Sequence, residues 1–220
     1  AIYYVAVTGI QWSNLPGEFP NYKSVYYHYR KWCQDGTWRR INQQMVYLER
    51  LRVGRLPRPS AGIMDSQSAK TTESGGLRGY DGNKKVSGRK RHILVDTLGN
   101  LLDVVVTVAN LHDTKGATLL LSKVETMTTL RLLKIWADKG YRGDLIALMQ
   151  QEWDIQLEIV QREEGQTGFV VEARRWVVER TFAWFGKYRR LSKDYEHCIN
   201  SSEGMIYIAS SHTMLKRFVD

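Results

Sequence analysis

The sequence has few cysteines and prolines, two and four among 220 residues, and no long uninterrupted apolar run. Because Cys33 and Cys198 lie far apart and in no paired spacing, the sequence suggests neither a zinc site nor a disulfide framework, and reduced cytoplasm fits it best. The longest apolar run, LLDVVVTVANL, is interrupted by Asp103 and is too short to cross a bilayer, and no charged-then-apolar signal opens the chain. We therefore expect a protein that is neither exported nor embedded in a membrane.

Acidic residues are fewer than basic ones. The sequence has 32 lysines and arginines and 23 aspartates and glutamates, which gives a net charge of +9. The surplus is uneven, because residues 1–62 hold nine basic and three acidic side chains. Such a surplus favours polyanionic partners, most directly nucleic acid, although it says nothing about the fold. With 43% hydrophobic and 11% aromatic residues, the chain is globular rather than disordered.

Residues 1–56 show the apolar spacing of helices. The opening AIYYVAVTG is already helix-like, so we expect the natural start to lie upstream of Ala1. In NYKSVYYHYRKWCQDG, Asn21 is suited to cap a helix and Gly36 to end it. A helix, a turn and a second helix with a cationic outer face suit a DNA major groove, and a plain helical bundle with an aromatic core is the alternative. The candidate DNA contacts here are Lys23, Tyr27, Arg30 and Lys31.

The stretch GRLPRPSAG contains two prolines and two glycines in nine residues and predicts a linker at 57–62. It divides the helical DNA-binding region, 1–56, from a second domain, 63–220. In that domain, strands come first and then alternate with helices. Strands are expected over 62–66, 89–100, 101–111, 132–140 and 154–162, and helices over 114–127, 143–153 and from about Glu172. With a hairpin turn at Leu98-Gly99-Asn100, this order predicts an α/β fold with a mixed five-stranded sheet flanked by helices.

The stretch RGYDGNKKVSGRKRH carries six basic residues, one acid and three glycines. We interpret it as a flexible basic loop or ribbon that enters the second strand, with a solvated hairpin end as the alternative. Its candidate DNA contacts are Lys84, Lys85, Arg89 and Lys90.

Two acids end apolar strands. Asp65 follows the short apolar run from Ala61 to Met64, and Asp138 ends the strand in LLKIWADKG. A strand-end acid either caps a turn or grips a metal ion. If the two strands lie side by side, these carboxylates can share a divalent cation.

Glu179 is the sole acid between Ala173 and Lys193, where seven residues are basic, and Arg175 lies one helical turn before it. Read alone, such a glutamate is an ion-pair partner. Together with two strand-end acids it can hold two metal ions roughly 4 Å apart, which activate an attacking hydroxyl and stabilise the leaving oxygen in phosphoryl transfer. The surrounding cations would hold a nucleic-acid backbone by phosphate contacts.

The stretches IMDSQSAKTT, NLHDTKGA, ADKGYRG and RRWVVERTFAWFGKYRRLSKDYE, in this order, resemble the DDE transposases of bacterial insertion sequences, in the insertion sequence five and insertion sequence four superfamily. The stretch GIQWSNLPGEFPNYKSVYYHYRKW is similar to the amino-terminal helical region of that group. The resemblance implies a ribonuclease H-like catalytic domain with Asp65, Asp138 and Glu179 as the catalytic, metal-binding triad. It also implies two Mg²⁺ ions, with Mn²⁺ as a substitute, and double-stranded DNA as substrate.

One part of the family pattern does not match. The pattern around the glutamate is a tyrosine, two residues, an arginine, three residues, the glutamate, six residues and a lysine. Arg175 and Glu179 match, but the tyrosine position holds Glu172 and the lysine position holds Gly186, with Lys187 one place late. The predicted DNA contacts of this region are Arg175, Lys187, Arg189 and Arg190.

Three further residues are candidates for lining the site, namely Ser66, His112 and Arg142. Ser66 either touches phosphate or closes the turn after Asp65. His112 belongs to the family motif NLHDTKGA, whereas the following Asp113 reads as a turn residue and helix cap.

The resemblance implies a cytoplasmic, nucleoid-associated transposase. It would cleave the terminal inverted repeats of a transposon and join the freed 3′ hydroxyl to target DNA, working as a homodimer in a synaptic complex. Two alternatives remain, a metal-dependent nuclease of the same fold and a transposase-derived DNA-binding protein without catalysis.

Overall fold

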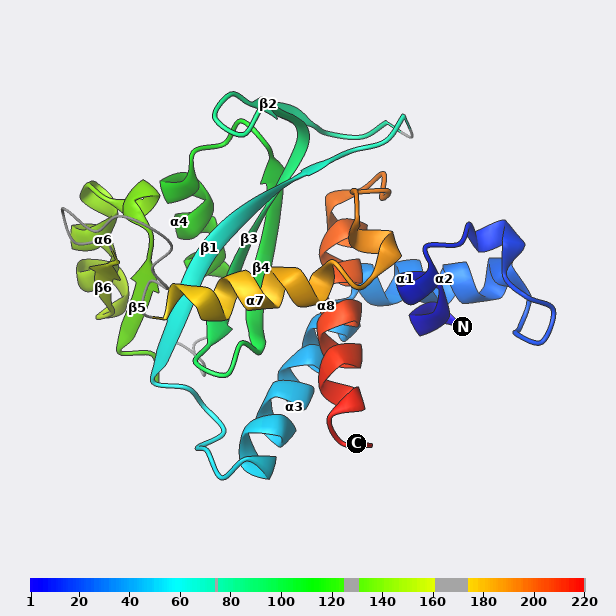
Figure 1. Cartoon of the computed structure of the whole chain (residues 1–220), viewed down its shortest axis with the longest axis horizontal. Helices are drawn as coiled ribbons and strands as arrows, with labels where there is room; N and C mark the ends of the chain where they lie inside the picture. Colours follow the sequence, from blue (N-terminus) through cyan, green and yellow to red (C-terminus); the bar gives the residue numbers. More distant parts are fainter. Residues whose placement is uncertain (74, 125–130, 161–173, 220) are drawn as a thin grey trace, which may run out of the picture.

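A computed structural model describes residues 1–73, 75–124, 131–160 and 174–219 (Figure 1). The front of the chain is helical, with α1 (Ile2–Thr8), η1 (Trp12–Asn14), α2 (Tyr22–Gln34) and α3 (Thr37–Arg52). The strands are β1 (Ala61–Lys70), β2 (Gly79–Asp81), β3 (Val86–Asp96), β4 (Leu101–Val108), β5 (Lys134–Ala137) and β6 (Gln156–Ile159). The later helices are α4 (Asp113–Lys123), η2 (Lys139–Tyr141), α6 (Asp144–Trp153), α7 (Arg175–Phe185), η3 (Arg189–Leu191) and α8 (Ile199–Lys216).

The strands form one mixed sheet. β1 pairs antiparallel with β3 on one side and parallel with β5 on the other, and β5 pairs parallel with β6. The opposite side of β3 carries β4 and, near the start of β3, the short β2, both antiparallel. The predicted mixed α/β architecture, as in a ribonuclease H-like domain, is confirmed, and β2 adds a sixth strand to the five expected. The basic stretch 78–92 is therefore a ribbon made of β2, an exposed turn and the start of β3.

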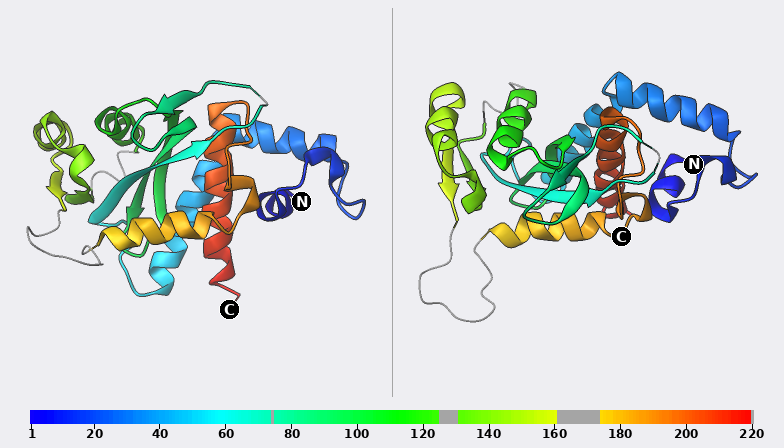
Figure 2. Two further views of the ribbon diagram at one scale, coloured as in Figure 1. Left: turned by 45° about the horizontal axis from the view of Figure 1, so that its top comes forward. Right: turned by 90° about the horizontal axis from the view of Figure 1, so that it is seen from above.

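Helices cover both faces of the sheet. Successive residues of a strand point to opposite faces, so Ile63 and Met64 of β1 join different apolar clusters. Ile63 packs in the cluster that contains Val177 and Val178 of α7 and much of α8, and Met64 packs in the cluster of α4 and α6. Figure 2 shows α4 and α6 on one side of the sheet and α7 on the other. The ends of β1 and β5 therefore lie between the two helical layers.

The front helices pack against α8 and share its core (Figure 1). Ala6 of α1, Tyr29 of α2 and Trp38 of α3 belong to the same apolar cluster as Ile63. The buried Tyr29 hydroxyl donates a hydrogen bond to the Ser201 carbonyl oxygen at 2.7 Å. In this arrangement residues 1–56 lie against the rest of the chain, and their independence as a DNA-binding region stays a prediction.

The expected long helix near the C-terminus is two helices. Glu172, its predicted start, lies outside the described residues, as do the ends of the helix predicted to reach 127 and of the strand predicted to reach 162. α7 ends at Phe185 before Gly186, and the chain forms η3 before α8 begins at Ile199. The sequence did not predict α8 because this helix is buried on most sides and shows no alternation of polar and apolar faces. Among the described residues, the helices include none with the length and apolar character that a bilayer span requires.

Candidate active site

Asp65 and Asp138 lie on neighbouring parallel strands. Asp138 directly follows the last residue of β5, whereas Asp65 lies in the middle of β1, so the prediction that Asp65 ends its strand is wrong. Ile63 of β1 pairs with Trp136 of β5. Two residues further on, each strand presents an acid on the same face, because side chains alternate along a strand. The register of the sheet therefore brings together the two acids that the sequence pattern identified.

Each of these carboxylates accepts a hydrogen bond from a backbone N–H group just beyond it. Ser66 N–H donates to Asp65 Oδ1 at 2.7 Å, and Gly140 N–H donates to Asp138 Oδ1 at 2.8 Å. The second bond caps η2, so the reading of a strand-end acid as a turn cap also describes Asp138. Because the donors are backbone groups, they fix the direction of both acids.

The ionisation of Asp65 depends on its burial and on its charged neighbours. Burial raises the pKa of Asp65 to about 6, the negative charge of Asp138 adds to the rise, and the Ser66 N–H and the Arg175 guanidinium oppose it. Burial and mutual repulsion disfavour two ionised acids together, so a cation between them would be stabilising. Carboxylate oxygens are the ligands that Mg²⁺ and other hard cations prefer, and Asp65 and Asp138 fit such an ion.

Glu179 lies on α7, the helix that packs across β1. Its side chain is 57% exposed, and its Oε1 atom lies 3.3 Å from Arg175 Nη2, one turn earlier on the helix. Within the part of the chain that the structure describes, no three His, Cys, Asp or Glu side chains are arranged to hold a metal ion. Of the predicted triad, two acids are adjacent and the third is in an ion pair with Arg175.

Asp113 is an acid of this site that the sequence interpretation treated as a turn and cap residue. The structure gives the cap to His112, whose Nδ1 accepts the Thr114 N–H at 3.4 Å. Asp113 Oδ1 instead accepts a hydrogen bond from Ser66 Oγ at 2.9 Å and lies 3.1 Å from Lys90 Nζ. Sequence reasoning missed these contacts because an acid that begins a helix ordinarily serves that helix's own N-terminus.

The buried side chain of Tyr141 lies among three acids. Burial raises the pKa of this phenol well above its ordinary value, and the negative charges of Asp65, Asp113 and Asp138 add to the rise. Asp113 is therefore part of the same local cluster of charge as Asp65 and Asp138.

The other predicted site-lining residues are near these acids in different ways. Ser66 contacts both Asp65 and Asp113. His112 and Arg142 line a hollow of about 590 Å³ beside the N-terminal ends of α4 and α6. The walls of this hollow contain none of the three clustered acids.

Comparison with known proteins decides the family. The sequence model described as "Transposase DDE domain" matches residues 56–214, well over half of the chain. This chain belongs to the DDE transposase domain family. A second family, described as "Putative transposase of IS4/5 family", matches residues 1–42 of the same DDE transposase chain. The resemblance inferred from the sequence motifs is confirmed.

This DDE transposase chain is 31% identical over 118 residues to the "Putative transposase for insertion sequence element IS402" of Burkholderia cepacia. The aligned part covers 50% of this chain and 54% of the relative, so the chain spans about half the length of that curated relative. The DDE transposase domain implies use of a divalent metal ion, for which Asp65 and Asp138 are suitable ligands.

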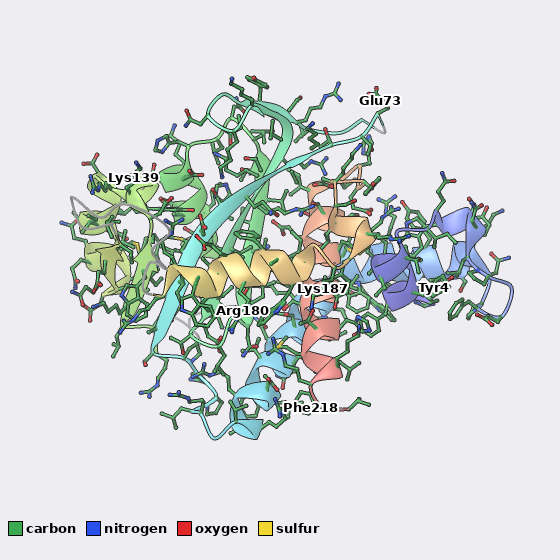
Figure 3. All side chains as sticks on the ribbon, viewed as in Figure 1. Tyr4, Glu73, Lys139, Arg180, Lys187 and Phe218 are labelled. Carbon is green, nitrogen blue, oxygen red and sulfur yellow. The ribbon has the colours of Figure 1, made fainter. Side chains whose placement is uncertain are left out.

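The residues predicted to contact DNA lie on several parts of the DDE transposase structure. The polar face of α2 is exposed opposite the buried Val25 and Tyr29. Figure 3 shows Lys187 just beyond the C-terminal end of α7. Arg175 is half-buried and Arg190 largely buried, each in an ion pair with a glutamate. The predicted contacts with exposed side chains are Lys23, Tyr27, Arg30, Lys31, Lys84, Lys85, Lys187 and Arg189.

Burial removes Arg89 and Lys90 from the predicted DNA contacts. Arg89 is 0% exposed, its Nη1 lies 3.3 Å from Asp194 Oδ2, and it donates hydrogen bonds to three backbone carbonyl groups. Lys90 is buried in its ion pair with Asp113. Neither cation can reach a DNA phosphate in this fold, because each is already desolvated and paired inside the protein.

Proposed function

We propose that this protein is a transposase that cleaves the ends of an insertion sequence and joins them to target DNA. The observation that carries the proposal is the convergence of Asp65 and Asp138 from the neighbouring strands β1 and β5 within a DDE transposase domain. Phosphoryl transfer on DNA needs acids that hold cations at the scissile phosphate, and no covalent nucleophile is required.

The cofactor in this proposal is Mg²⁺, with Mn²⁺ as a substitute, held by Asp65, Asp138 and Glu179. Two such ions, when bound, would activate the attacking hydroxyl and stabilise the leaving oxygen. The chain's own groups orient the acids, since the N–H groups of Ser66 and Gly140 hold two of the carboxylates.

Glu179 can complete the triad only if its ion pair with Arg175 opens. The pair is exposed enough for water to weaken it, so opening costs little. A DNA phosphate is a competing partner for Arg175, because guanidinium groups bind phosphate with paired hydrogen bonds. DNA binding would thereby release Glu179 toward the other two acids.

The proposed partners are double-stranded terminal inverted repeats and target DNA. The exposed cations of α2 and the turn between β2 and β3 would contact the backbone of the repeats. The same triad would then serve strand transfer, in which the freed 3′ hydroxyl attacks target DNA. We further propose a homodimer that holds two ends in one synaptic complex, and a cytoplasmic, nucleoid-associated location.

The domain division also belongs to this proposal, with a helical DNA-binding region at 1–56, a linker at 57–62 and the catalytic domain at 63–220. Because the front helices share apolar contacts with α8, the helical region would work while docked on the catalytic domain.

The deciding experiment incubates the protein with the flanking ends of its element and Mg²⁺ or Mn²⁺, and detects cleaved and joined strands. Cleavage together with joining of pre-cut ends supports a transposase. Cleavage without joining identifies a metal-dependent nuclease of the same fold. If Asp138→Ala leaves every activity unchanged, the protein is a DNA-binding protein without catalysis. If Asp138→Ala loses cleavage but retains DNA binding, that alternative is excluded.

A further inference from the structure

We propose that Asp113 is a positioning residue that holds in place the two backbone N–H groups which orient Asp65 and Asp138. The inference rests on the proposed function, because it gives Asp113 a part in preparing the same cation site. Three sets of contacts support it, through Ser66, through Gly140 and through Lys90.

Ser66 connects Asp113 to Asp65. The Ser66 N–H group donates to Asp65 Oδ1 at 2.7 Å, while its Oγ donates to Asp113 Oδ1 at 2.9 Å. Its carbonyl oxygen accepts a third hydrogen bond from Lys84 Nζ at 3.1 Å. All three polar groups of Ser66 therefore form hydrogen bonds. The bond to Asp113 fixes the Ser66 side chain, and the N–H group of the same residue orients Asp65.

Gly140 lies near both Asp138 and Asp113. Its N–H group donates to Asp138 Oδ1 at 2.8 Å. A Cβ atom built on Gly140 would lie 3.0 Å from Asp138 Oδ1 and 3.6 Å from Asp113 Oδ2, so the second oxygen of Asp113 lies close to this turn. Asp113 thus has one oxygen on the β1 side of the site and the other on the β5 side.

Lys90 holds Asp113 in this position. Its Nζ atom lies 3.1 Å from Asp113 Oδ1 and 3.7 Å from Asp81 Oδ2, and it donates to the Leu111 carbonyl oxygen at 2.9 Å. The lysine side chain is largely buried, so its charge requires these acceptors. Asp81 is anchored in turn by Ser68 Oγ at 2.6 Å. The network joins β1, β2, β3 and the start of α4 close to Asp65 and Asp138.

Because Lys90 holds Asp113 in place, this arrangement gives a buried, positively charged lysine a role next to acids that would bind metal ions. Groups that orient the ligands of a metal ion commonly change metal affinity or activity by roughly 10–100-fold when they are removed. Asp113 does not need to touch the ion or the DNA for this effect, because it acts through Ser66 and the Gly140 turn.

The test compares Asp113→Asn with Asp144→Asn. Asp144 is a matched control, since it is exposed and begins α6 as Asp113 begins α4, so both substitutions remove an acid from a helix N-terminus. Asparagine keeps the shape of the side chain and an acceptor for Ser66 but removes the charge that Lys90 requires. Ser66→Ala is the second variant, which removes only the hydroxyl bond to Asp113.

We measure Mn²⁺ binding by calorimetry on the DNA-free protein, and kcat and KM for cleavage of end DNA. Asp113→Asn should bind Mn²⁺ roughly 10–100-fold more weakly and lose kcat to a similar extent, with KM for DNA unchanged. Ser66→Ala should change both quantities in the same direction, and Asp144→Asn should change neither.

Wild-type affinity for Mn²⁺ and wild-type kcat in Asp113→Asn, with only thermal stability lowered, would overturn the positioning role and leave the proposed function intact. If Asp113→Asn does not fold, the same result in Ser66→Ala overturns it. A wild-type protein that neither binds Mn²⁺ nor cuts end DNA overturns the proposed function, and this inference with it.

Discussion

Arg175 Nη2 lies 3.3 Å from Glu179 Oε1, one helical turn apart on α7, and the charge of the same arginine opposes the rise that burial causes in the pKa of Asp65 on β1. The Arg175 guanidinium therefore interacts with two members of the predicted triad, Glu179 and Asp65. In the proposed function a divalent ion would take over this role between the acids, and Arg175 would turn to a DNA phosphate.

The first prediction concerns Glu179→Gln, which keeps the size of the side chain but removes its charge. Cleavage of end DNA should fall roughly 100-fold or more, because a carboxylate ligand of the ions that stabilise the transition state is lost. Stability should change by no more than about 0.5 kcal/mol, since the Glu179 carboxylate is largely exposed and water weakens its ion pair with Arg175. Single-turnover cleavage rates and urea unfolding measure the two effects.

The matched control is Glu152→Gln, which removes an exposed glutamate from α6. It should cleave at the wild-type rate. Equal rates for Glu179→Gln and wild type would remove Glu179 from the catalytic set.

The second prediction concerns the pH dependence of stability in the metal-free protein. The pKa of Asp65 is raised from 3.8 to about 6 by folding, so the folded protein binds a proton more tightly than the unfolded chain between these values. Ionised Asp65 therefore destabilises the fold, and its contribution becomes more unfavourable as pH rises from about 4 to about 6. Relative to Asp65→Asn, the wild type should lose about 2 kcal/mol between about pH 4.5 and about pH 7.5.

Urea unfolding of both proteins at the two pH values, in the presence of a chelator, measures this loss. A difference between wild type and Asp65→Asn that is the same at both values would contradict the raised pKa. Added Mg²⁺ should stabilise the wild type more than Asp65→Asn at the higher pH, because ions bind the ionised carboxylate.

Much of the fold could be predicted because local patterns determine it. Apolar runs that end at Asp65 and Asp138 indicated two strands, and the parallel register of β1 and β5 then brings these acids together. The hairpin turn at Leu98-Gly99-Asn100 was predictable because Gly99 takes a positive φ of 84° that other residues rarely adopt.

Features that depend on burial could not be predicted. Arg89 reads as a surface cation in a basic run, yet it is enclosed by the segment around Asp194, more than a hundred residues away in the chain. Asp113 reads as a helix cap, and only the approach of β1 and β3 turns it toward Ser66 and Lys90. Charge and spacing in a sequence indicate which residues can ionise, but the tertiary fold decides which of them meet.

The third prediction concerns the buried ion pair that joins the front helices to the sheet. Arg50 Nη1 on α3 lies 2.6 Å from Asp96 Oδ2, and Asp96 Oδ1 accepts the N–H groups of Leu98 and Asn100 in the β3–β4 turn. Arg50→Ala leaves the Asp96 charge buried and unpaired, so the free energy of unfolding should fall by about 3–5 kcal/mol. Urea denaturation followed by circular dichroism measures this loss.

Arg40→Ala is the control for that substitution, because Arg40 is exposed on the same helix and its bonds to Asp35 and Thr37 lie at the surface. Its effect should stay within about 1 kcal/mol. A loss in Arg50→Ala as small as that of Arg40→Ala would mean that α3 is not fastened to the β3–β4 turn in solution.

The fourth prediction concerns Arg30 on the exposed face of α2, opposite the buried Val25 and Tyr29. If Arg30 contacts a DNA phosphate, Arg30→Ala should weaken binding to specific and unrelated duplexes alike and reduce the slope of log K against log salt by roughly 0.9. Arg55→Ala, which removes an exposed cation beyond the end of α3, should leave the slope unchanged. Fluorescence anisotropy over a salt series measures the DNA affinity of the wild type, Arg30→Ala and Arg55→Ala. An unchanged slope in Arg30→Ala would mean that this face of α2 does not contact the DNA backbone, because loss of a phosphate contact necessarily reduces the number of counterions that binding releases.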